Sequence, residues 1–215
     1  MPYYAVARGW NVGIYTSWDQ CQPMVNHYSG ALYKRFSSRS SAWNFLESHL
    51  PQRELYMITE RERLFSRGTD DCVSIYTDGA CRRNGRQGAQ AGIGVFFADN
   101  HPNNVSRVAE NRRTNIGAEM EAVLEAVSII GSYQLDHVVI YTDCQFIVKG
   151  MNNWIWGWMK RGWQNINNQP VAYKQEFQFL NAKRRRWRIQ FEHVRGHSGI
   201  YGNEQADKLA RRALP

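Results

Sequence analysis

Short alternating apolar runs dominate the first fifty residues and indicate strands. The runs YYAVARG (3–9), VGIYTS (12–17) and LYKRF (32–36) are rich in β-branched and aromatic residues and predict three short strands. The stretch 17–28 begins with serine and aspartate caps, and with 40–50 it has the spacing of a helix. The pattern therefore predicts a small α/β module, with a three-stranded sheet and two helices.

A segment of mixed charge and little apolar periodicity, 51–70, follows this module and opens with a proline, so we expect a linker that is partly helical. From 71 to 215 three strands come first, and helices then alternate with strands. The expected strands are 73–77, 91–97, 105–109, 137–142 and 188–193, and the expected helices are 117–132, 144–151, a helical stretch ending near 182, and 203–214. This order predicts an α/β domain, a mixed five-stranded sheet flanked by helices. The expected domains are thus 1–50 and 71–215.

Composition narrows the class of protein. Of the 215 residues, 43% are hydrophobic and 13% aromatic, enough for folded cores, and no apolar run approaches the roughly 18 residues of a membrane span. The N-terminus lacks the layout of a signal peptide. Four scattered cysteines without metal-ligand spacing favour reduced thiols. We expect an intracellular monomer without membrane contact, in the nucleus or cytoplasm, with the mitochondrion as the alternative.

The net charge of +8 favours a polyanionic partner. Acids nevertheless recur at selected positions. The tetrapeptide IYTD occurs twice, ending at Asp78 and Asp143. If the two strands are parallel neighbours, both aspartates lie side by side at the carboxyl edge of the sheet, where α/β sheets bind ligands. Such a pair repels unless a cation lies between its members. The alternative is that each aspartate merely ends a strand.

Two helices supply further inward acids. Glu119 lies on the apolar stripe of its helix, whereas Glu121 and Glu125 are expected to point to the other side. Asp207 lies in line with Ala210 on the last helix, although a capping or solvated acid is the alternative there. The candidate set is thus Asp78, Glu119, Asp143 and Asp207. Oxygen ligands suit Mg²⁺ or Mn²⁺, and two such ions form a clamp for displacement at phosphorus.

Four blocks in this half of the chain, YTDGA…NG, RRTNIGAEMEAV, VIYTDCQF and VRGHSGIYGNEQADKLARRA, resemble those of ribonuclease H, type 1. The first module is similar to the hybrid-binding domain of its eukaryotic members. The resemblance implies an endonuclease that cleaves the RNA strand of RNA–DNA hybrids and leaves 5′-phosphate and 3′-hydroxyl ends. It also implies that the four acids hold two Mg²⁺ ions, with Mn²⁺ as the alternative metal.

The resemblance also assigns roles to polar residues. His197, on a glycine-rich loop suited to moving protons, is expected to assist catalysis. Asn84 and Asn115 match contacts to the minor groove, where ribose 2′-hydroxyls mark the RNA strand. Arg112 and Thr114 match a pocket for a DNA phosphate. Two positions depart from the family pattern: Ile116 replaces a glutamine of the minor-groove contact, and Tyr173 replaces an asparagine of the phosphate pocket.

Basic and aromatic residues are interleaved in two places. The stretch WIWGWMKRGW matches the family's basic protrusion, with Trp154, Trp158, Lys160 and Arg161 as candidate contacts, although the two tryptophans are also spaced to pack within a helix. In the first module the candidate duplex contacts are Trp18, Tyr33, Lys34 and Arg35. Double-stranded RNA is a second candidate ligand for that module.

Two other functions compete with a ribonuclease H. One is an integrase-like nuclease on the same fold, and the other is a non-catalytic hybrid-binding protein. The His197 loop and the first module disfavour the former, and the full set of four acids disfavours the latter. His193 is expected to pack or to form a hydrogen bond from its strand.

Overall fold

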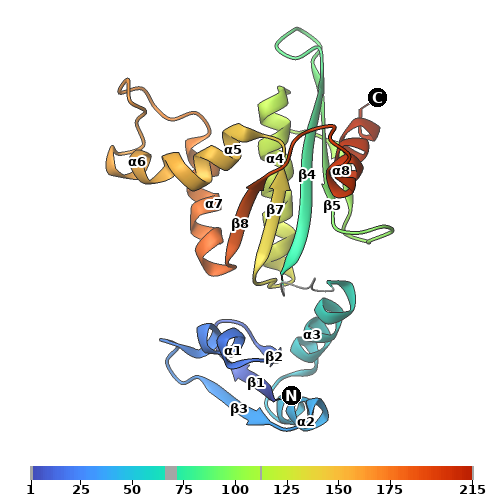
Figure 1. Ribbon diagram of the computed structural model, residues 1–215, viewed down its shortest axis with the longest axis vertical. Coiled ribbons are helices and arrows are strands. Elements are labelled where there is room, and N and C mark those ends of the chain that lie inside the picture. The colour runs from blue at the N-terminus through green and yellow to red at the C-terminus, as the bar shows by residue number, and fades with distance from the viewer. Residues whose placement is uncertain (1, 66–71, 112, 215) are drawn as a thin grey trace. The chain divides into compact units, whose positions relative to one another are not determined.

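The computed structural model describes residues 2–65, 72–111 and 113–214. The chain divides into two compact units, Met1–Ser66 and Arg67–Pro215 (Figure 1). Arg112, predicted to bind a phosphate, lies outside the described residues. No helix in the described part of the chain is long and apolar enough to cross a membrane.

The first unit contains the predicted three-stranded sheet. Its strands are β1 (Tyr3–Arg8), β2 (Gly13–Tyr15) and β3 (Leu32–Phe36), in the antiparallel order β2-β1-β3. Helices α1 (Trp18–Val25) and α2 (Arg39–Glu47) begin where serine side chains cap them, as Ser17 and Ser38 accept hydrogen bonds from backbone N–H groups three residues later. The predicted elements of this unit are confirmed.

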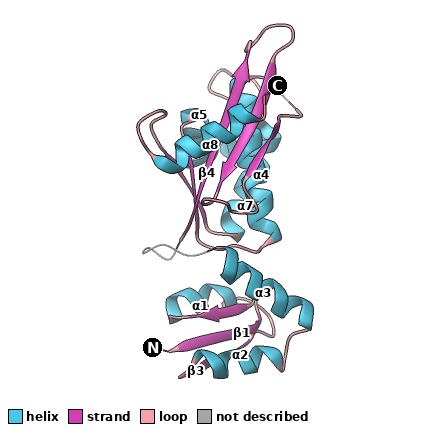
Figure 2. Cartoon of the chain, turned by 90° about the vertical axis from the view of Figure 1, so that its right-hand side faces the viewer, coloured by secondary structure: helices cyan, strands magenta, loops and turns pink. Residues whose placement is uncertain are grey.

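Alternation along β1 places a helix on each face of this sheet (Figure 2). Ala5 lies in the core with Leu46 of α2, and the next residue, Val6, lies in a second cluster with Cys21 of α1. The residues in 51–70 extend the first core further. Helix α3 (Gln52–Leu64) buries Leu55 and Ile58 against it.

The first unit therefore extends past the predicted boundary at residue 50, and the predicted linker is a docked helix over 52–64. Two apolar residues three positions apart are enough to bury one helical face, although charged residues surround them. Arg61 adds hydrogen bonds of 2.8 Å each to Asn11 Oδ1 and to the carbonyl oxygen of Val12. Sequence periodicity alone missed this docking because the apolar stripe is so short.

The second unit contains the predicted mixed five-stranded sheet, in the order β6-β5-β4-β7-β8. Its strands are β4 (Val73–Arg82), β5 (Gln90–Phe96), β6 (Val105–Val108), β7 (Val138–Thr142) and β8 (Ile189–His193). Strand β5 is antiparallel to both of its neighbours, β4 and β6, whereas β4, β7 and β8 are parallel to one another. Strand β4 does not end at residue 77 as predicted, because its second half pairs with β5.

Helices cover both faces of this sheet (Figures 1 and 2). They are α4 (Asn115–Ser132), α5 (Gln145–Lys149), a π-helical turn η1 (Gly150–Trp154), α6 (Ile155–Lys160), α7 (Lys174–Arg186) and α8 (Tyr201–Arg212). A side chain at Gly79 would clash with the backbone of α4, and one at Gly94 would clash with that of α8. Gly79 and Gly94 are on opposite faces, because Gly94 pairs with Asp78. Glycines thus bring both acid-bearing helices close to β4 and β5.

Candidate active site

The two IYTD segments are parallel neighbours in matching register. Ile75 pairs with Ile140, Tyr76 with Tyr141, and Thr77 with Thr142. The two tyrosine rings stack at 4.9 Å between centroids. Asp78 and Asp143 therefore follow at the same level of the sheet, as predicted.

Glu119 joins these two aspartates from α4. Because Gly79 has no side chain, the backbone of α4 lies against β4 just beside Asp78. Carboxylate oxygens of Asp78, Glu119 and Asp143 all lie within 4.8 Å of one another. Glu119 is only 4% exposed, and among the described residues its Oε2 has no hydrogen-bond partner. An unpartnered buried carboxylate oxygen beside two more acids fits a divalent cation held by oxygen ligands.

Asp207 lies at the rim of the same site. It lines one cavity of about 440 Å³ together with the three acids and His197. Its Oδ1 accepts a hydrogen bond of 2.7 Å from Nε of Arg211, one turn later on α8. Asp207 is thus brought to the site as predicted, and there it forms an ion pair with Arg211.

The burial and crowding of Asp78, Glu119 and Asp143 raise their pKa values. Burial raises the pKa of Asp78 to about 7, with further increases from the charges of Asp143 and Asp207 and a smaller opposing effect from the N–H of Gly79. The pKa of Glu119 is raised well above its usual range by burial and then by the two aspartates of the cluster. Burial also raises the pKa of Asp143, although the positive charge of His197 opposes that shift. Mutual repulsion of this kind is what a bound cation relieves.

The loop that carries His197 lies directly over Asp143. A side chain at Gly196 would clash with Oδ2 of Asp143, so only glycine lets the backbone approach this carboxylate. His197 itself is exposed and has a left-handed φ of 51°. Its ring is therefore beside the acids and open to solvent, as its predicted assisting role requires.

His193 is a site neighbour that the sequence did not reveal. Of the two predicted roles, packing in its strand is wrong, because the residue is exposed, and a hydrogen bond from the strand stays a prediction. Its pairing with Thr142 puts it one strand away from Asp143, and its charge acts to lower the pKa of that aspartate. Strand order is the observation that reveals this position. His193 ends β8, and its partner on β7 is Thr142, the residue before Asp143.

The predicted minor-groove residues meet at the start of α4. Oδ1 of Asn84 accepts a hydrogen bond of 3.1 Å from the backbone N–H of Asn115, so the turn after β4 is fastened to this helix. Thr114 is the N-cap, and its hydroxyl accepts from the N–H of Gly117 at 3.1 Å. Ile116 is exposed beside them. These polar residues lie one turn from Glu119.

Tyr173 is the N-cap residue of α7 and adopts the left-handed conformation, with a φ of 57°. Its ring centroid is 5.9 Å from that of Phe146, to which it is edge-on. The ring therefore belongs to an aromatic cluster. Asparagine tolerates this backbone conformation better than tyrosine does.

The two candidate tryptophans of the basic protrusion differ in exposure. Trp154 is 40% exposed, whereas Trp158 is 7% exposed and packs against Trp154, Trp163 and Phe177. Trp158 is thus a packing residue, a correction to its predicted role as a direct nucleic-acid contact. Lys160 and Arg161 are exposed at the end of α6.

The candidate residues of the first unit divide between two faces of its sheet. Trp18 and Tyr33 are exposed, with ring centroids 5.8 Å apart, and Arg35 lies on the same face of β3 as Tyr33. Lys34 points to the other face, where its Nζ lies 5.7 Å from the ring centroid of Phe36. One aromatic face that includes Arg35 is therefore formed, and Lys34 lies apart from it.

Comparisons with known proteins agree with this architecture. The sequence model of the family described as RNase H matches residues 70–215, and that described as Ribonuclease H1 N-terminal domain matches residues 2–46. The Ribonuclease H1 of Mus musculus is 32% identical over 97% of this chain and 88% of its own length. The Ribonuclease H of Schizosaccharomyces pombe is 31% identical over 98% of this chain and 96% of its own length. The solved PFV RNase H domain is similar in fold, with a TM-score of 0.52 at 23% identity over 65% of this chain and 92% of that domain.

Proposed function

Because this chain belongs to the ribonuclease H family and is a ribonuclease H hydrolase, we propose that it is an endonuclease for the RNA strand of RNA–DNA hybrids. The products would be a 5′-phosphate end and a 3′-hydroxyl end. One observation carries the proposal: three carboxylates from two strands and a helix converge within 4.8 Å, with a buried oxygen that lacks a partner among the described residues.

We assign the binding of two Mg²⁺ ions to Asp78, Glu119, Asp143 and Asp207, with Mn²⁺ as the alternative. Bound there, such ions would activate a water and stabilise the leaving oxygen. The first three acids lie at the centre of the site, and Asp207 would bind from the rim. The pairing of Asp207 with Arg211 leaves its second oxygen, Oδ2, for this role.

His197 is the group best placed to transfer protons. It is exposed, lies on a loop held against Asp143, and lines the same cavity as the acids. A neutral imidazole there would accept a proton from the attacking water, and an imidazolium would return one to the departing 3′ oxygen. The role is auxiliary, since the acids remain in place without it.

Substrate recognition would come from the start of α4 and from the protrusion. Asn84 and Asn115 are fastened together one turn from Glu119, and they would read ribose hydroxyls in the minor groove. Thr114, with Arg112, would bind a phosphate of the DNA strand. Trp154, Lys160 and Arg161 are exposed and would follow the same strand further along.

The first unit would bind a duplex with the aromatic face formed by Trp18, Tyr33 and Arg35. Flat rings suit the sugars of a duplex, and a single arginine suits a phosphate. The match of residues 2–46 to the N-terminal domain of ribonuclease H1 supports hybrid binding here. Double-stranded RNA would share enough of the minor-groove shape to be a second ligand.

One assay tests the proposal. Labelled RNA–DNA hybrid, RNA duplex and DNA duplex are each incubated with the full chain in Mg²⁺ and in EDTA. We expect internal cuts in the RNA of the hybrid, only with Mg²⁺, and 5′-phosphate ends on the fragments. Binding of the hybrid without metal-dependent cutting would identify a non-catalytic hybrid-binding protein. Cutting of the DNA duplex would instead identify an integrase-like nuclease.

A further inference from the structure

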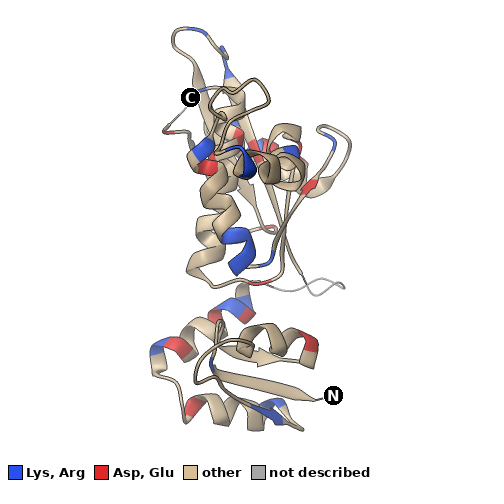
Figure 3. Ribbon diagram, turned by 90° about the vertical axis from the view of Figure 1, so that its left-hand side faces the viewer, with Lys and Arg blue, Asp and Glu red and all other residues tan. Residues whose placement is uncertain are grey.

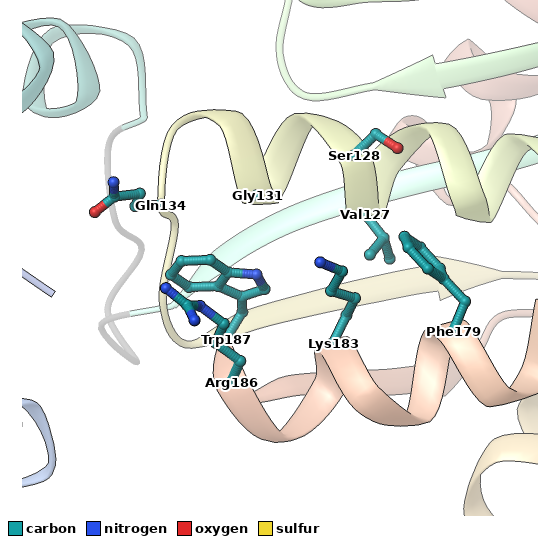
Figure 4. Close-up of a pocket in the computed structure, with 8 residues that line it drawn as sticks. All are labelled: Val127, Ser128, Gly131, Gln134, Phe179, Lys183, Arg186 and Trp187. Atoms are coloured by element: carbon teal, nitrogen blue, oxygen red, sulfur yellow. The ribbon is translucent and has the colours of Figure 1, made fainter. Parts of the chain in front are cut away.

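A groove separates the last turns of α4 and α7 in the second unit (Figure 4). Its volume is about 450 Å³, and its walls include Val127, Gly131, Phe179, Lys183, Arg186 and Trp187. It lies just before the first residues of β7 and β8, at the amino ends of these strands. The carboxylate cluster follows the other end of β7, so the groove is separate from the proposed active site.

An unpartnered buried donor faces this groove. Trp187 is 5% exposed, and its indole Nε1 has no hydrogen-bond partner among the described residues. Gly131 borders this nitrogen on the α4 side, where a Cβ would lie at ordinary van der Waals distance, 3.9 Å. A buried indole N–H without an acceptor is unusual, because buried donors are nearly always paired.

Positive charge surrounds this donor. In Figure 4 the ammonium group of Lys183 points toward the indole nitrogen, and Arg186 lies along the same ring, with its guanidinium carbon 4.7 Å from the ring centroid. None of the described residues that line the groove is acidic. The ends of α4 and α7 add some negative potential, but the last turn of α7 carries four basic residues, which outweigh it (Figure 3).

The groove also offers a flat apolar wall. The ring of Phe179 is 38% exposed and stands beside Val127, and Nζ of Lys183 lies 5.3 Å from its centroid. An anionic group that accepts from the indole N–H and pairs with Lys183 would therefore place whatever it carries against Phe179. Two cationic groups without a lining acid match the charge of a phosphate monoester, whereas a carboxylate would leave one of them unmatched.

We propose that this groove binds a phosphate monoester attached to a flat ring, as in a nucleoside monophosphate. The phosphate accepts from Trp187 Nε1 and pairs with Lys183 and Arg186, and the base stacks on Phe179. The site is independent of the proposed hydrolysis, because none of its residues is shared with the carboxylate cluster.

The test follows the indole N–H resonance of Trp187 in the ¹⁵N-labelled full chain, assigned with the Trp187→Phe variant. Adenosine 5′-monophosphate is added without divalent metal, in parallel with adenosine and with acetate. We expect a saturable shift with the nucleotide and none with adenosine. The shift should persist in Asp143→Asn, which separates this site from the carboxylate cluster.

Lys183→Gln should weaken nucleotide binding by about tenfold, since it removes one charge-assisted hydrogen bond. Arg185→Gln is the matched control, because this exposed arginine lies on the same turn but does not line the groove, and it should leave the affinity unchanged. An unmoved Trp187 resonance, or equal affinity in Lys183→Gln and the native chain, would overturn the proposal. So would a capped dipeptide with a free carboxylate that binds at least as tightly as the nucleotide.

Discussion

Glu119 and Glu121 lie two residues apart on α4, are equally buried at 4% and 5% exposure, and have opposite surroundings. Glu121 accepts a hydrogen bond of 2.7 Å from Arg107, which also pairs with Glu125, and further bonds from the backbone N–H groups of Glu110 and Asn111. Glu119 instead faces Asp78 and Asp143. The exposed fractions of the two side chains are the same, but only Glu121 has its charge compensated.

The pKa shifts follow the surroundings. Burial would raise the pKa of Glu121, but the N–H of Glu110 and the guanidinium of Arg107 outweigh it, and the pKa is lowered. At Glu119 burial and neighbouring carboxylates act together and raise the pKa. A buried acid with donors stabilises the fold, whereas a buried acid among acids needs a ligand. Partners therefore distinguish a structural acid from a functional one.

Replacement of each glutamate by glutamine should separate the functional acid from the structural one, and the largest effect is expected at Glu119. Glu119→Gln keeps the shape of the side chain but removes one charge from the proposed metal site. We expect hybrid cleavage in Mg²⁺ to fall by about 10³-fold or more, roughly 4 kcal/mol on the barrier. Hybrid affinity, measured by fluorescence anisotropy in EDTA, should stay within about twofold, or roughly 0.4 kcal/mol. Turnover close to that of the native chain would remove Glu119 from the site.

The same exchange at Glu121 should do the reverse. Glu121→Gln leaves Arg107 with one acid fewer and places an amide N–H among donors. We expect a loss of about 3 kcal/mol in the free energy of unfolding, measured with urea. Specific activity of the folded fraction should be unchanged. An inactive but equally stable variant would mean that Glu121, too, serves the reaction.

The crowding of acids around Glu119 should also appear in the pH dependence of stability, through its neighbour Asp78. A carboxyl whose pKa is raised on folding binds its proton more tightly in the folded state, so its contribution to stability is present at low pH. That contribution is lost as the pH rises from the pKa of the unfolded state to the pKa of the folded state. For Asp78 this range runs from about pH 4 to about pH 7. In metal-free protein we therefore expect Asp78→Asn to be more stable than the native chain at pH 8 and not at pH 4.

At pH 8 the free energy of unfolding of Asp78→Asn should exceed that of the native chain by on the order of 2 kcal/mol. The full shift would imply roughly 4 kcal/mol, but the amide is a weaker acceptor for the N–H of Gly79. Thermal unfolding by circular dichroism measures it. Mg²⁺ should stabilise the native chain and not the variant; a metal-independent difference at pH 8 would show that the acids do not bind the ion.

Sequence reasoning located the functional cluster because repetition and periodicity were both visible. Two IYTD segments and an acid on the apolar stripe of a helix were enough to bring Asp78, Glu119 and Asp143 together. It missed Arg107 as the partner of Glu121, because that contact joins a short edge strand to a helix and has no periodic signal. It also missed the docking of α3, which depends on two apolar residues, and the exposure of His193, which depends on strand order.

Two neighbouring basic residues of the first unit, Arg35 and Lys34, also differ in their surroundings. Arg35 shares a face with Tyr33, whereas Lys34 lies over Phe36 on the other face. Arg35→Ala should weaken hybrid binding by about 1 kcal/mol and reduce the slope of log K against log[salt] by about one unit, as for one lost phosphate contact. Lys34→Ala is the matched comparison and should change both less. Equal losses would mean that the duplex contacts both faces.

The smallest effect is expected at Tyr173, where one residue could serve either packing or phosphate binding. Its ring packs edge-on to Phe146, and its backbone holds the left-handed conformation that starts α7. Tyr173→Phe keeps the ring and removes only the hydroxyl. If the ring is what matters, hybrid cleavage should change by less than about 0.5 kcal/mol, because a neutral hydrogen bond contributes about 1 kcal/mol.

Single-turnover rates at subsaturating enzyme measure the change in cleavage, and the free energy of unfolding is the control for packing. A loss near 1 kcal/mol in cleavage at unchanged stability would show that the phenol binds the DNA phosphate in place of the family's asparagine, whereas equal losses in both would assign the hydroxyl to the fold.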